Sequence, residues 1–189
     1  KTGNPFNPRY EDRNLNVENF SERENQKGII ETIITDYHER KHTVVYLHGK
    51  SGIGKTLVGI LLAKRFGDKA TYCSDHDPTT PGDNFGILYN SVLPSKDNPL
   101  IISLDEFDTK IKKIKKAEDG TPNEYKGNVT IPVSDKATLN GYLDKFDHRL
   151  YPYVIFIMTG NSSGAEIDSW DPSYFRDGRL NLRLEMGSN

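Results

Sequence analysis

The stretch that decides the fold is Thr43–Thr56, TVVYLHGKSGIGKT. It begins with four consecutive apolar or aromatic residues, Val44–Leu47, which is typical of a short buried strand. The eight residues Gly49–Thr56 then fit the pattern G-x-x-x-x-G-K-[ST] without a mismatch. A strand that runs into such a loop predicts a phosphate-binding loop. The alternative is a glycine-rich turn between a strand and a helix that binds no ligand.

The residue types in this loop are those that phosphate binding requires. Its three glycines lack a Cβ, so the backbone can turn sharply and bring N–H groups within reach of phosphate oxygens. A helix predicted over Thr56–Phe66 adds the partial positive charge of its N-terminus. Lys55 supplies an ammonium for the β- and γ-phosphates, and the Thr56 hydroxyl is the natural ligand for Mg²⁺. We therefore expect these residues to bind the nucleotide: Gly49, Lys50, Ser51, Gly52, Ile53, Gly54, Lys55 and Thr56.

Composition limits the class of protein. The chain has 189 residues, enough for one α/β domain with a substantial core, and a net charge of −2 gives no strong global field toward nucleic acid or membrane. Apolar runs such as Val154–Met158 are too short to span a bilayer, and no signal peptide is visible. The single cysteine, Cys73, excludes an intramolecular disulfide and is interpreted as a small core residue in a buried strand. We expect a soluble segment of a reducing compartment, cytoplasmic or equivalent, without membrane contact.

The remaining chain alternates between strand and helix patterns, which predicts a mainly parallel sheet. Residues 1–21 are rich in Asn, Pro and charge and are interpreted as an arm or linker, so residues 22–189 form the nucleotide-binding domain. Further strands are expected over Ala70–Ser74, Leu100–Leu104, Tyr153–Thr159 and 180–184. Further helices are expected over Glu22–Glu39, Phe85–Ser91, around Lys110–Lys116 and after Asp135, with a mobile loop over Gly120–Pro132.

Two adjacent carboxylates follow the apolar run Leu100–Leu104. They lie at the carboxyl end of a predicted central strand, which is where ligands bind in open α/β sheets. Asp105 is expected in the Mg²⁺ shell, directly or through water, and Glu106 is expected to orient and deprotonate the attacking water. Strands often end in acidic residues, so this hypothesis depends on the phosphate loop upstream.

Two further features leave alternatives open. Phe85, which precedes Gly86, either packs against the start of its own short helix or is an exposed aromatic that grips a translocated polymer. Lysines surround Ile111 and Ile114 on the predicted helix over Lys110–Lys116, which is either a solvated face or a basic surface for an acidic partner or nucleic acid.

Later polar residues complete the candidate site. Asn161 follows the strand Tyr153–Thr159 and is either an ordinary turn residue or an amide that hydrogen-bonds the γ-phosphate or the attacking water. Arg176 and Arg179 lie three residues apart around Asp177-Gly178, and surface or helix-capping roles are the alternative for them.

Together these motifs resemble the AAA+ ATPases, and within them the branch with the mitochondrial Bcs-type AAA chaperones and the membrane AAA proteases. The resemblance covers Ile29–Glu185 and is carried by GKSGIGKT, LDEFD (Leu104–Asp108), TGN (Thr159–Asn161) and DPSYFRDGR (Asp171–Arg179). The last is similar to the family pattern D-P-A-L-L-R-P-G-R. The sequence departs from the family in GKSGIGKT, where the branch usually has PPGTGKT, and in Asp177, which replaces a proline.

The resemblance implies a three-layer α/β/α sandwich around a five-stranded sheet with strand order 5-1-4-3-2. It makes Lys55 and Thr56 the Walker A pair, Asp105 and Glu106 the Walker B pair, and Asn161 the sensor residue. It also makes Arg176 and Arg179 arginine fingers that reach a neighbouring subunit's site, which implies a ring, commonly a hexamer. The helical lid subdomain is expected to be absent, because the sequence stops after the final strand; we expect an excised large subdomain.

The function that we predict is Mg²⁺-dependent hydrolysis of ATP in an oligomeric ring, coupled to remodelling or translocation of a macromolecule. Two alternatives remain: a nucleic-acid motor or helicase ATPase, and an ATP-binding assembly module with little turnover.

Overall fold

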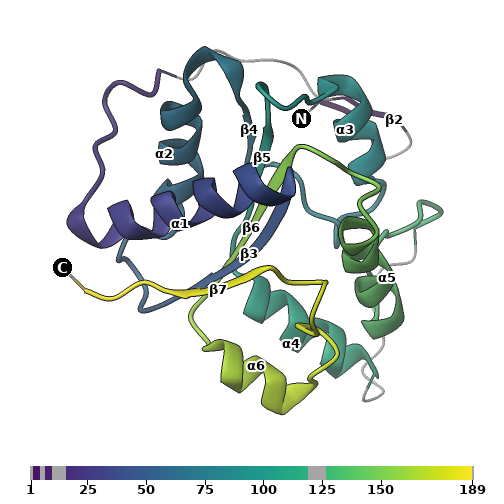
Figure 1. Cartoon of the computed structure of the whole chain (residues 1–189). Helices are drawn as coiled ribbons and strands as arrows, with labels where there is room; N and C mark the ends of the chain where they lie inside the picture. Colours follow the sequence, from purple (N-terminus) through teal and green to yellow (C-terminus); the bar gives the residue numbers. More distant parts are fainter. Residues whose placement is uncertain (1, 5–6, 10–15, 119–126, 189) are drawn as a thin grey trace.

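A five-stranded, wholly parallel sheet forms the centre of the protein, as seen in the computed structural model (Figure 1). The structure describes residues 2–4, 7–9, 16–118 and 127–188. The strand order is β4-β5-β6-β3-β7, which is the predicted order 5-1-4-3-2 read from the other edge. These strands are β3 (Thr43–His48), β4 (Thr71–Cys73), β5 (Leu100–Leu104), β6 (Val154–Gly160) and β7 (Leu182–Glu185).

The three central strands consist almost entirely of buried residues, because helices cover both faces of the sheet. Successive side chains of a strand point to opposite faces, and β3 illustrates this. Val44 and Tyr46 join one hydrophobic cluster, whereas Val45 and Leu47 join the other. The near-continuous apolar runs of the sequence therefore predict central strands correctly.

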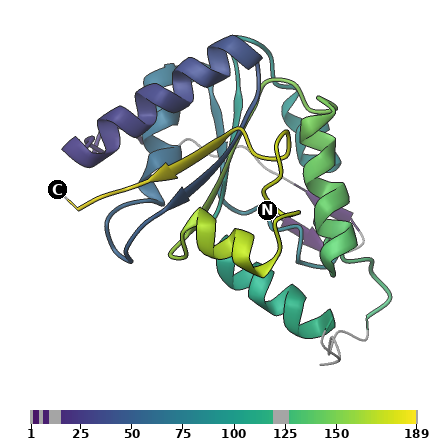
Figure 2. The same ribbon diagram turned by 60° about the horizontal axis from the view of Figure 1, so that its bottom comes forward.

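Two layers of helices enclose the sheet (Figures 1 and 2). On one face lie α1 (Glu24–Arg40) and α2 (Leu57–Phe66), which bury Ile33, Tyr37 and Leu62. A 3-10 turn, η1 (Gly67–Lys69), follows α2. On the other face lie α3 (Phe85–Val92), α4 (Phe107–Glu118), α5 (Lys136–Asp147) and α6 (Gly164–Trp170). The predicted three-layer α/β/α sandwich is confirmed.

Besides the 3-10 turn η1, the sequence did not predict three of the elements. Two short strands, β1 (Thr2–Asn4) and β2 (Asn7–Arg9), pair antiparallel in the N-terminal segment. Helix α6 has seven residues, of which Ile167 is fully buried and Trp170 partly buried, and two such positions are too few for a visible helical period. The Ser163 hydroxyl caps it by accepting from the Glu166 N–H. Of the predicted loop over Gly120–Pro132, residues 120–126 lie outside the described residues, and residues 127–132 form neither helix nor strand.

Two predictions about single residues need correction. Phe85 is 3% exposed and packs edge-on against Tyr151 and Phe156, so the exposed, polymer-gripping interpretation is wrong. Phe85 is a packing residue, as the alternative held, but these partners lie outside its own helix. Cys73 lies on β4, an edge strand whose residues are only half-buried, although it does pack against the core. Burial raises the pKa of its thiol.

In the part of the chain that the structure describes, no helix combines the length and the apolar character needed to cross a membrane.

Candidate functional site

The parallel register places the segments that follow β3, β5 and β6 side by side, at the carboxyl ends of these strands. His48, the last residue of β3, pairs with Gly160 of β6, and Leu104, the last residue of β5, pairs with Met158. The phosphate loop, the pair Asp105-Glu106 and Asn161 therefore emerge side by side at the carboxyl ends of adjacent strands. This edge is where ligands bind in open α/β sheets.

A pocket of about 290 Å³ lies at this edge. Its lining comprises Ser51, Gly52, Gly54, Lys55, Thr56, Asp105, Glu106, Thr159, Gly160 and Asn161. Eight of these are predicted site residues, which come from three separate segments of the sequence. Of the predicted loop residues, Gly49, Lys50 and Ile53 do not line the pocket, and neither do Arg176 and Arg179.

The backbone of the phosphate loop presents unused donors. In the described part of the chain, no hydrogen bond uses the backbone N–H groups of residues 50–56. Gly52 and Gly54 have φ values of 79° and 99°, a region that residues with a Cβ rarely adopt. At Gly49 the reason for glycine is different, because a Cβ there would lie 2.5 Å from the Met186 carbonyl oxygen. The loop is thus built from residues that let the backbone N–H groups face the pocket.

The Lys55 ammonium lies between the loop and β6. It donates to the carbonyl oxygens of Gly49 and Lys50 at 2.7 and 2.8 Å and to the Asn161 Oδ1 at 3.1 Å. Burial lowers its pKa, and the negative charges of Asp108 and Asp105 oppose that shift. The structure therefore brings the predicted Walker A lysine into direct contact with the predicted sensor amide.

Asp105 and Thr56 form an oxygen-rich part of the same pocket. The Thr159 hydroxyl donates to the Asp105 Oδ1 at 2.8 Å, and no hydrogen bond among the described residues uses Oδ2. Oxygen ligands are those that Mg²⁺ prefers, and it commonly takes one or two from protein alongside phosphate oxygens. The Thr56 hydroxyl, one free carboxylate oxygen and space for a phosphate fit this ion.

Glu106 has an unusual backbone conformation for its residue type. Its φ is 55°, in the left-handed region, and its side chain is exposed at the pocket. Non-glycine residues in this region carry a conformational cost of order 1 kcal/mol and cluster at functional sites. The conformation turns the carboxylate toward the ligand space instead of continuing β5 or starting α4.

Asp108 is a site residue that sequence reasoning missed. Its buried carboxylate accepts from the backbone N–H groups of Asn161 and Ser162, both at 3.0 Å. Burial by itself would raise the pKa of Asp108, but these backbone bonds outweigh it and the pKa is lowered. The Tyr46 hydroxyl adds a further bond to the same turn, because it donates to the Ser162 carbonyl at 2.7 Å. The turn that carries Asn161 is thus held by two side chains, and the second aspartate of LDEFD was the only signal for this in the sequence.

The two C-terminal arginines are bound to helix α5 of their own chain. Arg179 is 7% exposed and makes two hydrogen bonds to the Asp144 carboxylate, at 2.6 and 3.0 Å. Arg176 is exposed and donates to Asp144 at 2.8 Å. The arginines of one motif therefore differ, because Arg179 is enclosed and Arg176 remains accessible from outside.

These arginines lie near the amino ends of the strands, whereas the phosphate loop lies at the carboxyl ends. Asn181, two residues after Arg179, is bonded to Val44 at the start of β3. The loop begins five residues after Val44, roughly 16 Å away at 3.3 Å per strand residue. In Figure 1 the loop between β3 and α2 lies at lower left and α5 lies at right. The structure does not bring these arginines together with the Walker residues of the same chain.

The Asp144 cluster predicts a pH-dependent stability. Its hydrogen bonds to Arg179 lower the pKa of Asp144 to about 2, from 3.8. A depressed carboxyl pKa gives stability that is present above pH 3.8 and lost as the pH falls toward 2. Asp144→Asn is therefore expected to cost about 2 kcal/mol of unfolding free energy at pH 7, because the enclosed Arg179 loses its charged partner. The variant should also lose less stability than the wild type between pH 4 and pH 2.

Urea unfolding at several pH values checks this. Asp147→Asn is the matched control, since the Asp147 carboxylate lies 3.7 Å from Arg176 and is equally exposed. Parallel pH profiles for Asp144→Asn and the wild type would contradict the assigned coupling.

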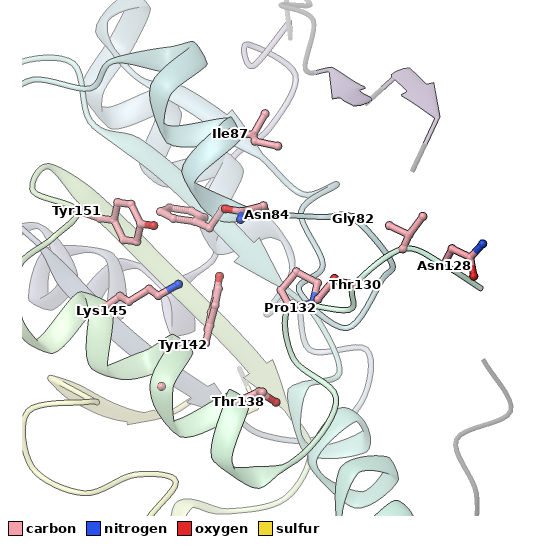
Figure 3. A pocket seen from close by; sticks show the side chains of 13 residues that line it. Gly82, Asn84, Ile87, Asn128, Thr130, Pro132, Thr138, Tyr142, Lys145 and Tyr151 are labelled. Atoms are coloured by element: carbon pink, nitrogen blue, oxygen red, sulfur yellow. The ribbon is translucent and has the colours of Figure 1, made fainter. Parts of the chain in front are cut away.

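A larger cavity of about 640 Å³ lies elsewhere, between α3, α5 and residues 128–132 (Figure 3). Aromatic and apolar side chains such as Phe85, Tyr142 and Tyr151 dominate its lining, and among the described residues that line it Lys145 is the one with a charge. It contains none of the predicted site residues, so its size does not make it the site of chemistry. The smaller pocket holds the groups that can bind phosphate and activate water.

The lysine-rich helix α4 has a buried stripe and an exposed basic face. Ile111 and Ile114 are buried, Lys110 pairs with Asp77 at 2.6 Å, and the Lys112 ammonium lies 4.8 Å from the centre of the Trp170 ring. The remaining lysines of the segment are exposed and make no ion pair with any described residue: Lys113, Lys115 and Lys116. The structure is compatible with both the solvated-face and the basic-surface interpretations.

Comparisons with known proteins agree with this architecture. The Aeropyrum pernix ORC2 protein, solved as ADPNP-ADP complexes, is similar to this chain with a TM-score of 0.51 and 16% sequence identity. The similarity covers 96% of this chain and 50% of that chain, so this chain spans about half the length of that relative. At this identity the likeness concerns the fold alone. A search of curated protein sequences gave no match.

The sequence profile of one family matches residues 45–188, which is most of the chain and includes every segment of the pocket at the carboxyl edge of the sheet. Its members are described as the ATPase family associated with various cellular activities. Membership implies binding of a nucleotide, which agrees with the unused N–H groups, the lysine and the carboxylates of this pocket. The chain belongs to the AAA ATPase family.

Proposed function

We propose that this chain is the nucleotide-binding domain of a Mg²⁺-dependent ATPase that works in an oligomeric ring to remodel or move a macromolecule. The observation that carries the proposal is the meeting, in one pocket, of Lys55, Thr56, Asp105, Glu106 and Asn161 beside a loop with unused N–H groups. The similarity to a protein solved as ADPNP-ADP complexes supports an adenine nucleotide.

The phosphate loop binds the phosphates of the nucleotide. Its backbone N–H groups and the N-terminus of α2 attract phosphate oxygens, and Lys55 exchanges its carbonyl partners for the β- and γ-phosphates. Thr56 and Asp105 hold Mg²⁺, which when bound neutralises charge on the phosphates. Thr159 fixes the rotamer of Asp105 through the 2.8 Å hydrogen bond.

Hydrolysis uses the exposed carboxylate and amide at the mouth of the pocket. Glu106 accepts a proton from the attacking water, so that the oxygen attacks the γ-phosphorus while the bond to the β-phosphate oxygen breaks. Asn161 orients that water or the γ-phosphate with its amide, which Asp108 holds in place through the backbone. Both residues reach the pocket from strand ends that adjoin in the sheet.

The ring supplies the charge that the pocket lacks. We assign to Arg176 the role of stabilising charge in a neighbouring subunit's pocket. Arg176 is exposed and lies near the amino ends of the strands, away from the pocket of its own chain, so a neighbouring subunit's pocket can meet it. Arg179 instead has a structural role, because it is buried and hydrogen-bonded to the Asp144 carboxylate of its own chain. Within the family, the pattern DPSYFRDGR supports the branch with Bcs-type chaperones and membrane AAA proteases.

The test is ATP binding and hydrolysis in two lysine variants, one inside the phosphate loop and one outside it. Lys55→Ala is expected to weaken ATP binding at least about 10-fold and to abolish hydrolysis, because charge-assisted bonds to phosphate contribute about 1.5–3 kcal/mol each. Lys69→Ala is the control, because Lys69 is exposed and lies outside the pocket lining. Equal losses in both variants, measured by titration with a fluorescent ATP analogue and by phosphate release, would contradict the site.

A nucleic-acid motor is the second candidate, favoured by the exposed face of Lys113, Lys115 and Lys116 on α4. Hydrolysis stimulated by single-stranded nucleic acid, with binding that falls steeply as salt rises, would support this candidate over a protein remodeller.

A further inference from the structure

The first turn of α1 touches the phosphate loop through a single buried side chain. Gln26 is 0% exposed, and its Nε2 donates to the carbonyl oxygen of Gly54 at 3.0 Å. Its Oε1 accepts from the backbone N–H of Arg23 at 2.8 Å. A polar side chain with no access to water thus joins the start of one helix to the loop that precedes another.

The orientation of this amide follows from its two partners. A backbone N–H can only donate and a carbonyl oxygen can only accept, so Oε1 must face Arg23 and Nε2 must face Gly54. A buried amide that satisfies a donor and an acceptor at once holds both in fixed positions. The contact is also close: a Cβ on Gly54 would lie 2.9 Å from Nε2, and φ at Gly54 is 99°.

Peptide geometry carries the effect into the pocket. In a trans peptide the C=O and the following N–H point in opposite directions, within one plane. The Gly54 oxygen accepts from the Leu57 N–H of α2 at 3.2 Å and from Gln26. Because Gln26 draws this oxygen toward α1, the N–H of Lys55 points away from α1. That N–H belongs to the unused donors of residues 50–56, and both Gly54 and Lys55 line the pocket.

We propose that Gln26 is a positioning residue of the phosphate loop: it sets the peptide plane between Gly54 and Lys55 and so aims the Lys55 N–H at a bound phosphate. The proposal rests on the proposed nucleotide function of the pocket. It concerns the shape of the loop, so it also applies to the nucleotide-free protein.

The surroundings of α1 make this contact part of a larger attachment. The Lys64 ammonium, on α2, donates to the Phe20 carbonyl at 2.7 Å, and the Arg65 guanidinium donates to both carboxylate oxygens of Glu22. The segment before α1 is therefore fixed to α2 at the far end of that helix, while Gln26 fixes α1 at the loop. Gln26 alone among these contacts reaches the pocket lining.

The test is the pH dependence of Gln26→Glu. A carboxylate has no proton to donate and repels the Gly54 oxygen, whereas the protonated acid donates as the amide did. The nearby Arg23 guanidinium lowers the pKa of a carboxyl group at this position, and burial raises it above the ordinary 4.3. We expect burial to be the larger effect, which brings the change into the range where the protein can be studied. Relative to wild type at the same pH, the variant should bind a fluorescent ATP analogue about 10-fold more weakly at pH 8 and recover to about the wild-type affinity at pH 5.5.

Two comparisons separate positioning from mere stability. Gln26→Leu keeps the side chain buried but has no titrating group, so its weak binding should not depend on pH relative to wild type. Asn25→Ala, which removes a hydrogen bond to the Gly187 carbonyl in the same turn of α1, should bind ATP like the wild type. Thermal unfolding of each variant confirms that the compared proteins are folded.

A second readout does not require nucleotide. In the nucleotide-free protein, the ¹⁵N–¹H resonance of Lys55 should shift in Gln26→Glu at pH 8 and return toward the wild-type position at pH 5.5. The proposal would be overturned if, at pH 5.5, neither the Lys55 resonance nor the affinity for ATP returned toward the wild-type value. Failure of the wild type to bind ATP, with the Lys55 resonance still responding, would instead refute the proposed function and leave the positioning role standing.

Discussion

Glu106→Gln is expected to lower kcat for ATP hydrolysis by about 10²–10⁴-fold, the range that a general base contributes. The Kd for ATP should change by less than about twofold, because glutamine keeps the shape of the side chain and removes only the proton acceptor. The structure places Glu106 suitably for this role: its carboxylate is exposed at the pocket and its backbone has a φ of 55°. Single-turnover phosphate release and equilibrium titration measure the two quantities separately.

Glu166→Gln provides the matched control, since Glu166 is an exposed carboxylate on the nearby helix α6 outside the pocket lining. It should hydrolyse ATP like the wild type. A different result is that the wild type binds ATP tightly and shows no hydrolysis that depends on Glu106. That result would support an assembly module with little turnover.

Arg176→Ala is expected to lower kcat in the assembled protein by about 10³-fold or more, the effect typical of an arginine supplied across a subunit boundary. Mixed with Glu106→Gln subunits, these subunits should regain activity, although each variant alone is inactive. At a mixed boundary, the intact pocket of an Arg176→Ala subunit receives Arg176 from a Glu106→Gln neighbour. Phosphate release at several mixing ratios measures the recovery.

Arg149→Ala serves as the control, because Arg149 is exposed and makes no ion pair with any described residue. It should retain wild-type activity alone and in mixtures. Assembled mixed rings that stay inactive would show that Arg176 does not act across the boundary.

Those residues of the site that follow an apolar strand were predictable from the sequence. Leu100–Leu104 is buried throughout, and a fully apolar run of this length specifies a central strand, which in turn specifies where Asp105 lies. The phosphate loop is equally local, because its spacing encodes its own geometry. In both cases the information lies within a few consecutive residues.

The residues that support the site were not predictable in this way. Gln26 and Asp108 act through hydrogen bonds to segments 28 and 53 residues away, and nothing in their own neighbourhoods identifies those partners. The difference between Arg176 and Arg179 likewise depends on how α5 packs, since both contact the same Asp144. Phe85 is similar, because its burial results from rings on α5 and β6.

The separation of Arg176 from the phosphate loop restricts the symmetry of any active assembly. A two-fold dimer joins a surface patch to the same patch on its partner, so it could bring Arg176 to the partner's pocket only if one patch included both ends of the strands. A contact that pairs the arginine end of one subunit with the pocket end of the next is head-to-tail. Repeating this contact from subunit to subunit produces either a closed ring or an open chain. In an open chain the terminal pocket has no arginine donor, whereas closure gives every pocket one. On this proposal, full activity per subunit is a property of the closed assembly, and an open chain approaches it only as it lengthens.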